Sequence, residues 1–381
     1  MTLPATFYKL EDALEKARIP DDIIYSSDIL TCELEYLPRF IDIDANLHEL
    51  NHLAHRLSAL NEWELDCFEG MVMMDAIQTE YAPIPVERLI NMTRSMEHCQ
   101  IAYEAHDDAS LGKFYVDNGF VPDSESLPEN AFDCLDYGKI GKEMREGEGG
   151  VFTPHGYVAQ NGEIAKTYQS GDAIPAENPD YMILLQVRKE SANDPQLDNH
   201  MVALLPLPAD DAAVFQVLES VGAKALQECT LRIDDCIAPG LMELFPGELA
   251  GCDGDITVLD ALTDQLYKFK HEGRLTTYKA MLEAAPKSIS LEDAIDLADH
   301  TEEFTLMQGT SSPADYARKE LEKHGLPLID DLLSRAHLAH YGTKLMEQGG
   351  AINTDYGVLL PLNGQTLEQC FGRSDIQMDM S

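Results

Sequence analysis

Residues 135–158, LDYGKIGKEMREGEGGVFTPHGYV, and residues 336–358, AHLAHYGTKLMEQGGAINTDYGV, share one pattern at distant places in the chain. Each stretch predicts a short amphipathic helix, a Gly-Gly stop that supplies positive φ at the helix C-terminus, and a brief extended segment closed by Gly156 or Gly357. Since this pattern is local structure and not a catalytic motif, it points to duplication of a whole structural unit.

Other stretches recur in the same order. Residues 46–57 match residues 255–266 in their spacing of apolar side chains, and residues 84–90 match residues 289–295. A period near 205 residues is too long for a solenoid repeat. The chain is therefore predicted to be a tandem duplication.

We expect an α+β fold in which each copy is an elongated unit of small modules. These are an antiparallel sheet with a helix, a helical middle, and a small α/β C-terminal module. The first copy is assigned residues 1–165, with its helical middle at 46–101 and its C-terminal module at 102–159. The second copy is assigned residues 181–365, with modules at 181–254, 255–305 and 306–362. Residues 160–180 are predicted as a linker and residues 366–381 as a frayed tail.

The local patterns predict particular elements within each copy. β-rich runs at Tyr181–Val187 and His200–Leu207 indicate a hairpin that opens the second copy and is missing from the first. Helices are expected at 8–17, 47–60, 62–77, 86–98 and 211–221. Asn46 with Glu49, and Asn61 with Glu64, have the spacing of capping boxes.

Charge is the strongest global signal. The chain has 68 Asp and Glu against 27 Lys and Arg, which gives a net charge of −41. The excess belongs to both copies, because residues 1–165 hold 32 acidic and 11 basic side chains. Such a balance excludes direct nucleic-acid binding, which requires Lys and Arg for the phosphates, and favours a basic protein partner. Acidic solubility or adaptation to high salt is the alternative explanation.

The sequence also carries signals that bear on the compartment in which the protein is expected. No run of apolar residues is long enough to span a bilayer, and the N-terminus has no signal-peptide pattern. The 8 cysteines include no C-x-x-C pair, which suits buried thiols in a reducing compartment. A cytoplasmic protein without membrane contact and without a cofactor is expected.

One stretch resembles a zinc-hydrolase motif. His48-Glu49-Leu50-Asn51-His52 fits H-E-x-x-H, in which His48 and His52 would bind zinc and Glu49 would act as general base. The leucines at 47, 50, 53 and 57 define one helical face, so His48, His52 and His55 are expected to face water. Incidental surface residues are favoured, and a metal-dependent hydrolase is kept as an alternative. The pairs Asp234-Asp235 and Asp330-Asp331 lack the rest of an EF-hand loop and are predicted to be solvated turns.

The acidic positions suggest a binding surface. Glu62, Asp66 and Glu69 fall at i, i+4 and i+7 of a predicted helix, and no Lys or Arg occurs between Arg56 and Arg88. Like charges at this spacing destabilise a helix by about 0.2–0.5 kcal/mol per pair. A row of acidic side chains that lowers helix stability therefore suggests that these side chains bind a partner. A plain solvated face is the alternative. The full predicted surface comprises Glu62, Asp66, Glu69, Asp75, Glu80, Glu97, Glu104, Asp107, Asp108 and Asp117.

The order of pieces resembles the ArdA-type antirestriction proteins of mobile genetic elements, across both copies. The resemblance rests on NLHELNHLAHRL, on DDASLGKFYVDNG, on DYGKIGKEM followed by GGVFTPHGYV, and on SSPADYARKELEKHG and HYGTKLMEQGGAINTDYGV. It implies an acidic, elongated DNA mimic that is not an enzyme and that occupies the DNA-binding cleft of a type I restriction-modification enzyme. Members usually pair as homodimers, so fused copies would form an intramolecular pseudo-dimer, with further dimerisation left open.

Three departures bear on the target. The first copy lacks the opening hairpin, the second has a less acidic middle with Lys268, Lys270, Arg274 and Lys279, and the His48 cluster is unusual. The partner is therefore expected to be a type I enzyme or a related defence nuclease. An acidic module that antagonises another basic nucleic-acid-binding protein is the further alternative.

Overall fold

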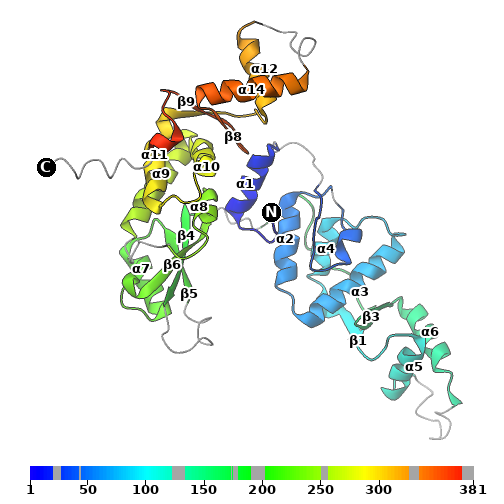
Figure 1. The fold of residues 1–381 in the computed structure, drawn as a ribbon. Coiled ribbons are helices and arrows are strands. Elements are labelled where there is room, and N and C mark those ends of the chain that lie inside the picture. The colour runs from blue at the N-terminus through cyan, green and yellow to red at the C-terminus, as the bar shows by residue number, and fades with distance from the viewer. Residues whose placement is uncertain are drawn as a thin grey trace. The chain divides into compact units, whose positions relative to one another are not determined.

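The protein is described here by a computed structural model that covers residues 1–19, 27–42, 44–121, 134–172, 174, 179–189, 202–249, 256–325 and 334–370. These residues form an α+β fold with three antiparallel sheets of three strands each (Figure 1). The chain separates into two compact units. Unit 1 comprises Met1–Ala5 and Asp21–Ala176, and unit 2 comprises Thr6–Pro20 and Glu177–Ser381. The predicted division therefore differs at one segment, because the first helix belongs to unit 2.

Unit 1 consists of a helical part followed by a small sheet and a helical pair. Its elements are η1 (Leu37–Arg39), α2 (Leu47–Ser58), α3 (Glu62–Gln78), α4 (Val86–Met92), η2 (Met96–His98), β1 (Cys99–Ala102), α5 (Asp108–Asp117), α6 (Tyr137–Glu148), β2 (Val151–Thr153) and β3 (Gly156–Gln160). The predicted helix at 86–98 ends early, because the Thr93 hydroxyl bonds to the Ile90 carbonyl and the Ser95 hydroxyl to the Asn91 carbonyl.

Unit 2 begins with the N-terminal helix and continues after residue 176. Its elements are α1 (Phe7–Ala17), β4 (Ile183–Lys189), β5 (Val202–Leu207), α7 (Asp211–Val221), η6 (Leu226–Glu228), β6 (Cys229–Cys236), α8 (Gly240–Leu244), α9 (Thr257–Glu272), α10 (Leu275–Ala284), α11 (Leu291–Asp299), η7 (Thr301–Glu303), β7 (Phe304–Met307), α12 (Pro313–Lys323), α14 (Arg335–Gly349), β8 (Ile352–Thr354), β9 (Gly357–Pro361) and η8 (Leu367–Cys370). Among the described residues, no helix combines the length and the apolar composition needed to cross a bilayer.

The repeated stretch adopts the predicted local structure in both units. Gly149 and Gly350, with φ of 71° and 66°, end α6 and α14 in the left-handed conformation. The strands that follow form hairpins, and the two sheets have the same order, β1-β3-β2 and β7-β9-β8. The helix, hairpin and sheet order are thus the same in both units, whereas their origin by duplication stays a prediction.

Within each helix pair, α5 with α6 and α12 with α14, the two helices approach so closely that backbone atoms of one meet a glycine of the other. A Cβ added at Gly112 of α5 would lie 1.9 Å from the Tyr137 carbonyl oxygen, and one at Gly141 of α6 would lie 1.8 Å from that of Asp108. In unit 2, a Cβ at Gly342 of α14 would lie 1.7 Å from the Pro313 oxygen. Both modules thus depend on glycine where their two helices meet.

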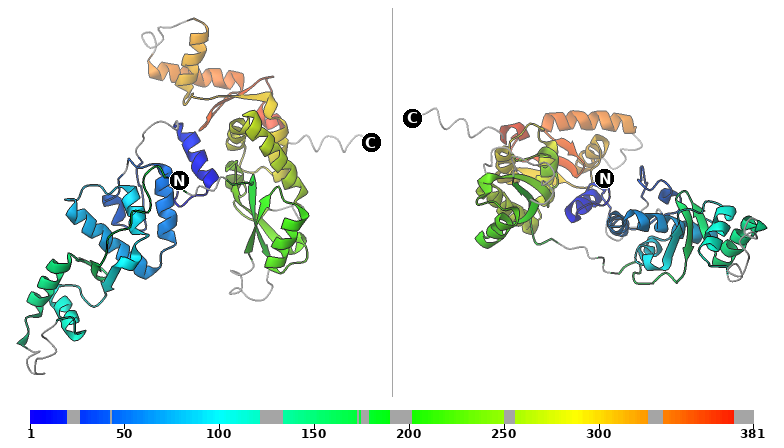
Figure 2. Two further views of the ribbon diagram at one scale, coloured as in Figure 1. Left: turned by 180° about the vertical axis from the view of Figure 1, so that it is seen from behind. Right: turned by 90° about the horizontal axis from the view of Figure 1, so that it is seen from below.

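The third sheet has the order β5-β4-β6, with α7 packed beside β5 and β4 (Figure 2). The predicted hairpin is confirmed as β4 and β5, whereas β6 was not predicted. Asp235, expected in a solvated turn, is fully buried at the end of β6 and accepts hydrogen bonds from the hydroxyls of Thr6 and Tyr181 at 2.7 and 2.9 Å. The other predicted turn, Asp330-Asp331, lies outside the described residues.

Helix α1 is anchored in unit 2 by buried charges. Asp12 is 3% exposed and Lys279 of α10 is 5% exposed, and their Oδ1 and Nζ atoms lie 3.0 Å apart. Lys279 also contacts Glu15 at 2.8 Å, while the Tyr356 hydroxyl donates to Asp12 at 2.7 Å. Lys279, which the sequence placed among the basic side chains of the second copy, is therefore an internal anchor for the N-terminal helix.

Parts of the predicted linker and of the predicted tail are packed against the rest of their units. In the predicted linker, Tyr168 is buried, and the Asn91 side chain accepts its backbone N–H at 2.9 Å and donates to its carbonyl at 2.7 Å. In the predicted tail, Leu367 and Cys370 are buried in the largest apolar cluster of unit 2. Residues 371–381 of that tail lie outside the described residues.

Candidate protein-binding acidic surface

The ten predicted surface carboxylates do not share one environment. Glu62, Glu80, Glu97, Glu104, Asp107 and Asp117 are exposed, and Asp108 is half-buried. Asp66, Glu69 and Asp75 of α3 are only 8%, 9% and 4% exposed. Helix α3 packs against β1, β2, β3 and α4, which leaves little of its circumference in water. The expectation of an exposed stripe Glu62–Asp66–Glu69 is therefore wrong.

Asp66 and Glu69 face a histidine that the sequence analysis missed. His155, at the tip of the β2–β3 hairpin, places Nδ1 at 3.5 Å from Asp66 and Nε2 at 3.7 Å from Glu69. The Tyr103 hydroxyl donates to Asp66 at 3.1 Å. Burial raises the pKa of Glu69, opposed by His155 and reinforced by Asp66. The two buried carboxylates thus lie in a polar cluster of unit 1 whose other members, His155 and Tyr103, are exposed.

A cavity of about 360 Å³ opens beside this cluster. Its lining includes Glu69, His155, Tyr36 and Arg39, together with Glu33, Leu34, Glu35 and Pro154. The Tyr36 hydroxyl is buried and has no hydrogen-bond partner among the residues that the structure describes. Burial raises the pKa of this phenol. No spacing in the sequence could reveal the cavity, and the predicted extended segment closed by Gly156 did not indicate the β2–β3 hairpin that places His155 beside it.

Two further predicted surface carboxylates have structural partners. Asp75 accepts a hydrogen bond from Arg88 Nε at 2.6 Å, and Asp108 receives two from Arg145 at 2.8 and 3.1 Å. The Arg145 hydrogen bond lowers the pKa of Asp108. These acids hold α3 to α4 and α5 to α6, so they are not available to a partner.

Asp107 is exposed and also caps α5. It accepts hydrogen bonds from the backbone N–H and the hydroxyl of Ser110, both at 2.7 Å. These bonds lower its pKa, as expected for an N-cap carboxylate. Asp107 therefore serves the helix whatever else it contacts.

The H-E-x-x-H stretch is not arranged as a hydrolytic centre. Glu49 is buried, and its Oε1 accepts hydrogen bonds from the hydroxyl groups of Tyr168 and Ser170 at 2.8 and 2.7 Å. It does not cap α2 as predicted, since Asn46 alone caps that helix by accepting the His48 N–H at 2.8 Å. The box of Asn61 and Glu64 is confirmed. His52 is half-buried, with Nε2 3.4 Å from the Arg94 guanidinium, so it does not simply face water.

The environment of His52 disfavours a cation there. Burial lowers the pKa of His52, and the nearby positive charge of Arg94 adds to this effect. A zinc ion bound at His48 and His52 would have to tolerate that guanidinium. The general base of the motif, Glu49, is already hydrogen-bonded elsewhere. The geometry gives the hydrolase alternative no support.

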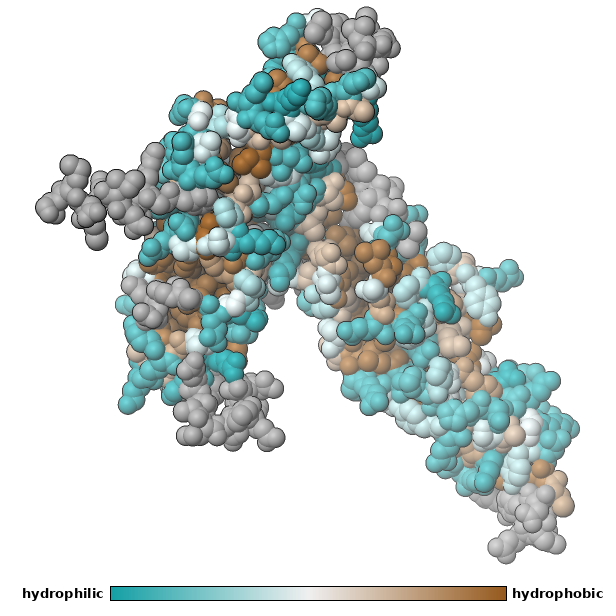
Figure 3. Space-filling model, viewed as in Figure 1, coloured by the Kyte–Doolittle hydropathy of each residue, from teal (hydrophilic) through white to brown (hydrophobic). Residues whose placement is uncertain are grey.

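Arginines of unit 1 are directed to internal partners. Besides the pairs with Asp75 and Asp108, Arg56 donates to the Thr93 carbonyl at 3.0 Å, and Arg94 donates to the Thr167 hydroxyl at 3.2 Å. Among the described residues of this unit, five Lys and Arg side chains remain exposed, which is fewer than the exposed carboxylates. They are Arg39, Lys113, Lys139, Lys142 and Lys166. On the face drawn in Figure 3, hydrophilic residues cover much of the module that contains α5 and α6.

Comparison with known proteins does not assign the chain to a group. No family model matches the sequence, and no curated protein matches it. The resemblance to antirestriction proteins rests on the quoted motifs alone.

Proposed function

We propose that this protein is a DNA mimic that binds the basic DNA-binding cleft of another protein and blocks it by competition. Following the motif resemblance, the target is a type I restriction-modification enzyme or a related defence nuclease. The partner is a protein, and the activity requires neither catalysis nor nucleic-acid binding by this chain. The two units would together present the equivalent of a dimer of single-copy relatives.

The proposal rests chiefly on how charge is distributed between surface and interior. The net charge is −41, and Arg56, Arg88, Arg94 and Arg145 of unit 1 have internal partners. Exposed carboxylates therefore dominate the potential outside this unit, and a basic cleft would be attracted to it.

Burial reduces the number of carboxylates that could contact the target. Asp66, Glu69, Asp75 and Asp108 serve the fold, so they are withdrawn from the surface. The remaining candidates are the exposed residues Glu62, Glu80, Glu97, Glu104, Asp107 and Asp117. They would pair with Arg and Lys of the target, which otherwise hold DNA phosphates. Because each contact is weak, binding depends on several at once and should weaken steeply with salt.

The test is inhibition of DNA cleavage by a purified type I enzyme. A neutralising variant, E62Q/E104Q/D117N, should inhibit less and should show a shallower dependence of affinity on salt. A charge-conserving variant, E62D/E104D/D117E, controls for changes of shape and should inhibit like the wild type. Asp66 and Glu69 are left unchanged, because they are buried and do not belong to the exposed contact set. Normal cleavage in the presence of excess folded protein would refute the proposed target.

A second measurement addresses the mechanism. A DNA mimic competes with DNA, so raising the DNA concentration should relieve inhibition in proportion. Inhibition that is unaffected by DNA concentration and by salt would indicate a different surface and a different mode of action.

A further inference from the structure

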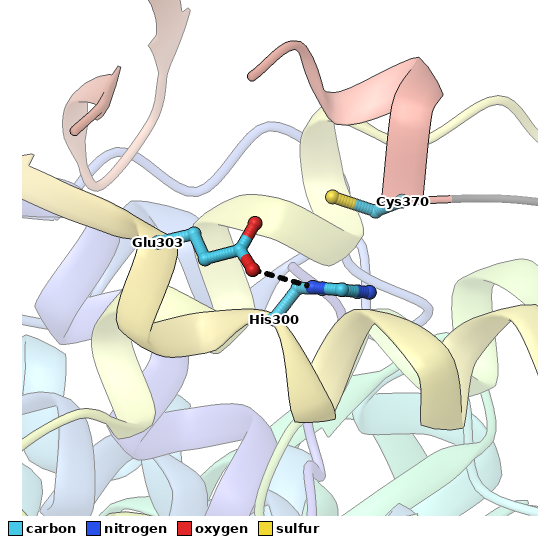
Figure 4. A group of neighbouring side chains, drawn as sticks. All are labelled: His300, Glu303 and Cys370. Atoms are coloured by element: carbon cyan, nitrogen blue, oxygen red, sulfur yellow. Dashed lines mark hydrogen bonds and ion pairs between the residues drawn. The ribbon is translucent and has the colours of Figure 1, made fainter. Parts of the chain in front are cut away.

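Three side chains with metal-binding atoms meet in unit 2, outside the surface considered above. His300 caps the C-terminus of α11, Glu303 ends η7, and Cys370 ends η8. One ligand atom from each lies within 4.8 Å of those from the other two. Figure 4 shows the Glu303 carboxylate against the His300 ring, with the Cys370 sulfur directed toward the pair. Among the described residues this is the one such group of three.

The Cys370 thiol accepts a hydrogen bond from Gln365 Nε2 at 3.7 Å and donates one to the Thr366 carbonyl at 3.9 Å. The unused ligand atom of this cluster is therefore on Glu303. His300 Nδ1 and Glu303 Oε1 lie 3.0 Å apart. The second carboxylate oxygen, Oε2, is buried and has no hydrogen-bond partner among the described residues. A buried carboxylate oxygen without a donor is unfavourable, and a bound cation would relieve that cost.

The backbone holds the three side chains in place. The Leu362 N–H donates to the Glu303 carbonyl at 2.8 Å, which fixes the turn against the chain leaving β9. Cys370 is 0% exposed and lies with Leu367 in the largest apolar cluster of the unit. Cys370 is not in a disulfide. The cluster therefore sits on packed elements, as a specific metal site requires.

We propose that His300, Glu303 and Cys370 bind one zinc ion through Nδ1, a carboxylate oxygen and the thiolate, with water in the fourth position. Sulfur, imidazole nitrogen and carboxylate oxygen are the ligands that zinc accepts in proteins. Zinc bonds of about 2.0–2.3 Å place tetrahedral ligand atoms roughly 3.3–3.8 Å apart, so small side-chain movements suffice. Thiolate and carboxylate together balance the charge of Zn²⁺, which suits a partly buried position.

A bound ion would also affect the stability of unit 2. It joins the turn after α11 to η8, two segments far apart in the sequence, and so ties the end of the described chain to the core of unit 2. Zinc binding should raise the melting temperature of this unit, because the ion binds only the folded arrangement.

The experiment uses the full chain, stripped with a chelator and titrated with Co²⁺ as a spectroscopic substitute for zinc. We expect one equivalent to bind, with a sulfur-to-cobalt charge-transfer band in the near ultraviolet that added Zn²⁺ abolishes. Binding should release a proton from the thiol, measurable by calorimetry in buffers of different ionisation enthalpy.

Variants then assign the ligands. C370A should lose the charge-transfer band, whereas C134A, at an exposed cysteine, should retain it. E303Q keeps a hydrogen-bonding group beside His300 and should weaken Co²⁺ binding by about tenfold or more, so it tests the site even where C370A folds poorly. Absence of saturable binding by the wild type, a band that persists in C370A, or unchanged affinity in E303Q would each overturn the proposal.

Discussion

The buried pair of Asp12 and Lys279 makes a quantitative prediction. In Lys279→Met, Asp12 keeps Lys16 at 3.1 Å and the Tyr356 hydroxyl at 2.7 Å, but it loses the ammonium at 3.0 Å. Removing one partner of a buried ion pair generally costs about 3–5 kcal/mol, and the two remaining contacts place this case near the lower end, at about 3 kcal/mol.

This loss should appear in unit 2. For a domain of this size, about 3 kcal/mol corresponds to a fall in melting temperature of roughly 6–12 °C. Thermal and urea unfolding followed by circular dichroism will measure the fall. Lys268→Met, at an exposed position of α9, serves as the control and should change stability by no more than about 0.5 kcal/mol.

A double variant separates the pair from the apolar packing of the lysine stem. Asp12→Asn combined with Lys279→Met leaves no unpaired buried charge at these positions and should recover part of the lost stability. The reasoning is refuted by a Lys279→Met protein as stable as its Lys268→Met control. It is also refuted by a double variant that is no more stable than Lys279→Met alone.

Three further predictions concern unit 1. Gly112→Ala should destabilise the α5–α6 module by about 1–3 kcal/mol or more, because its Cβ would overlap the Tyr137 carbonyl. Gly147 of α6 has open space around it, so Gly147→Ala should leave stability unchanged or raise it. Equal urea midpoints for Gly112→Ala and Gly147→Ala would contradict the close contact between Gly112 and the Tyr137 carbonyl. Glu49→Ala should destabilise unit 1 by about 1–3 kcal/mol, because the hydroxyl of the buried Tyr168 loses its hydrogen-bond acceptor. The zinc content of the protein should not change, and a fall in zinc content would restore the hydrolase alternative. Since the folded pKa of Glu69 is raised above 4.5, its contribution to stability is present at low pH and is lost as pH rises through the folded value. At neutral pH, Glu69→Gln should therefore unfold at a higher urea concentration than the wild type. Near pH 4 the two proteins should unfold at the same urea concentration, and a difference that persists there would show that burial of the charge is not its cause.

Local sequence signals predicted local structure well. The Gly-Gly stops, the box of Asn61 and Glu64, and the β4–β5 hairpin depend on neighbouring residues, and all are present. The shortened α4 shows the limit of such signals, because Thr93 and Ser95 bond to helix carbonyls that periodicity cannot register.

Long-range placement was the part that the sequence did not reveal. The spacing of Glu62, Asp66 and Glu69 put them on one helical line, but α3 is enclosed by strands that come about 30 to 90 residues later. Likewise, nothing near Glu49 indicates Tyr168, and nothing near Asp12 indicates Lys279. A buried carboxylate and a solvated one look alike in a sequence when the partner is distant.

The assignment of residues 6–20 to unit 2 has a consequence for biosynthesis and for protein engineering. Helix α1 leaves the ribosome before the rest of unit 2, because the strands and helices that receive it are made more than 160 residues later. Until then its apolar face, with Tyr8 and Leu10, has no permanent cover and is a natural substrate for a chaperone. A single cut near residue 176 would separate α1 from the rest of unit 2, whereas a rearranged chain in which α1 is moved to precede β4 would keep the elements of unit 2 together.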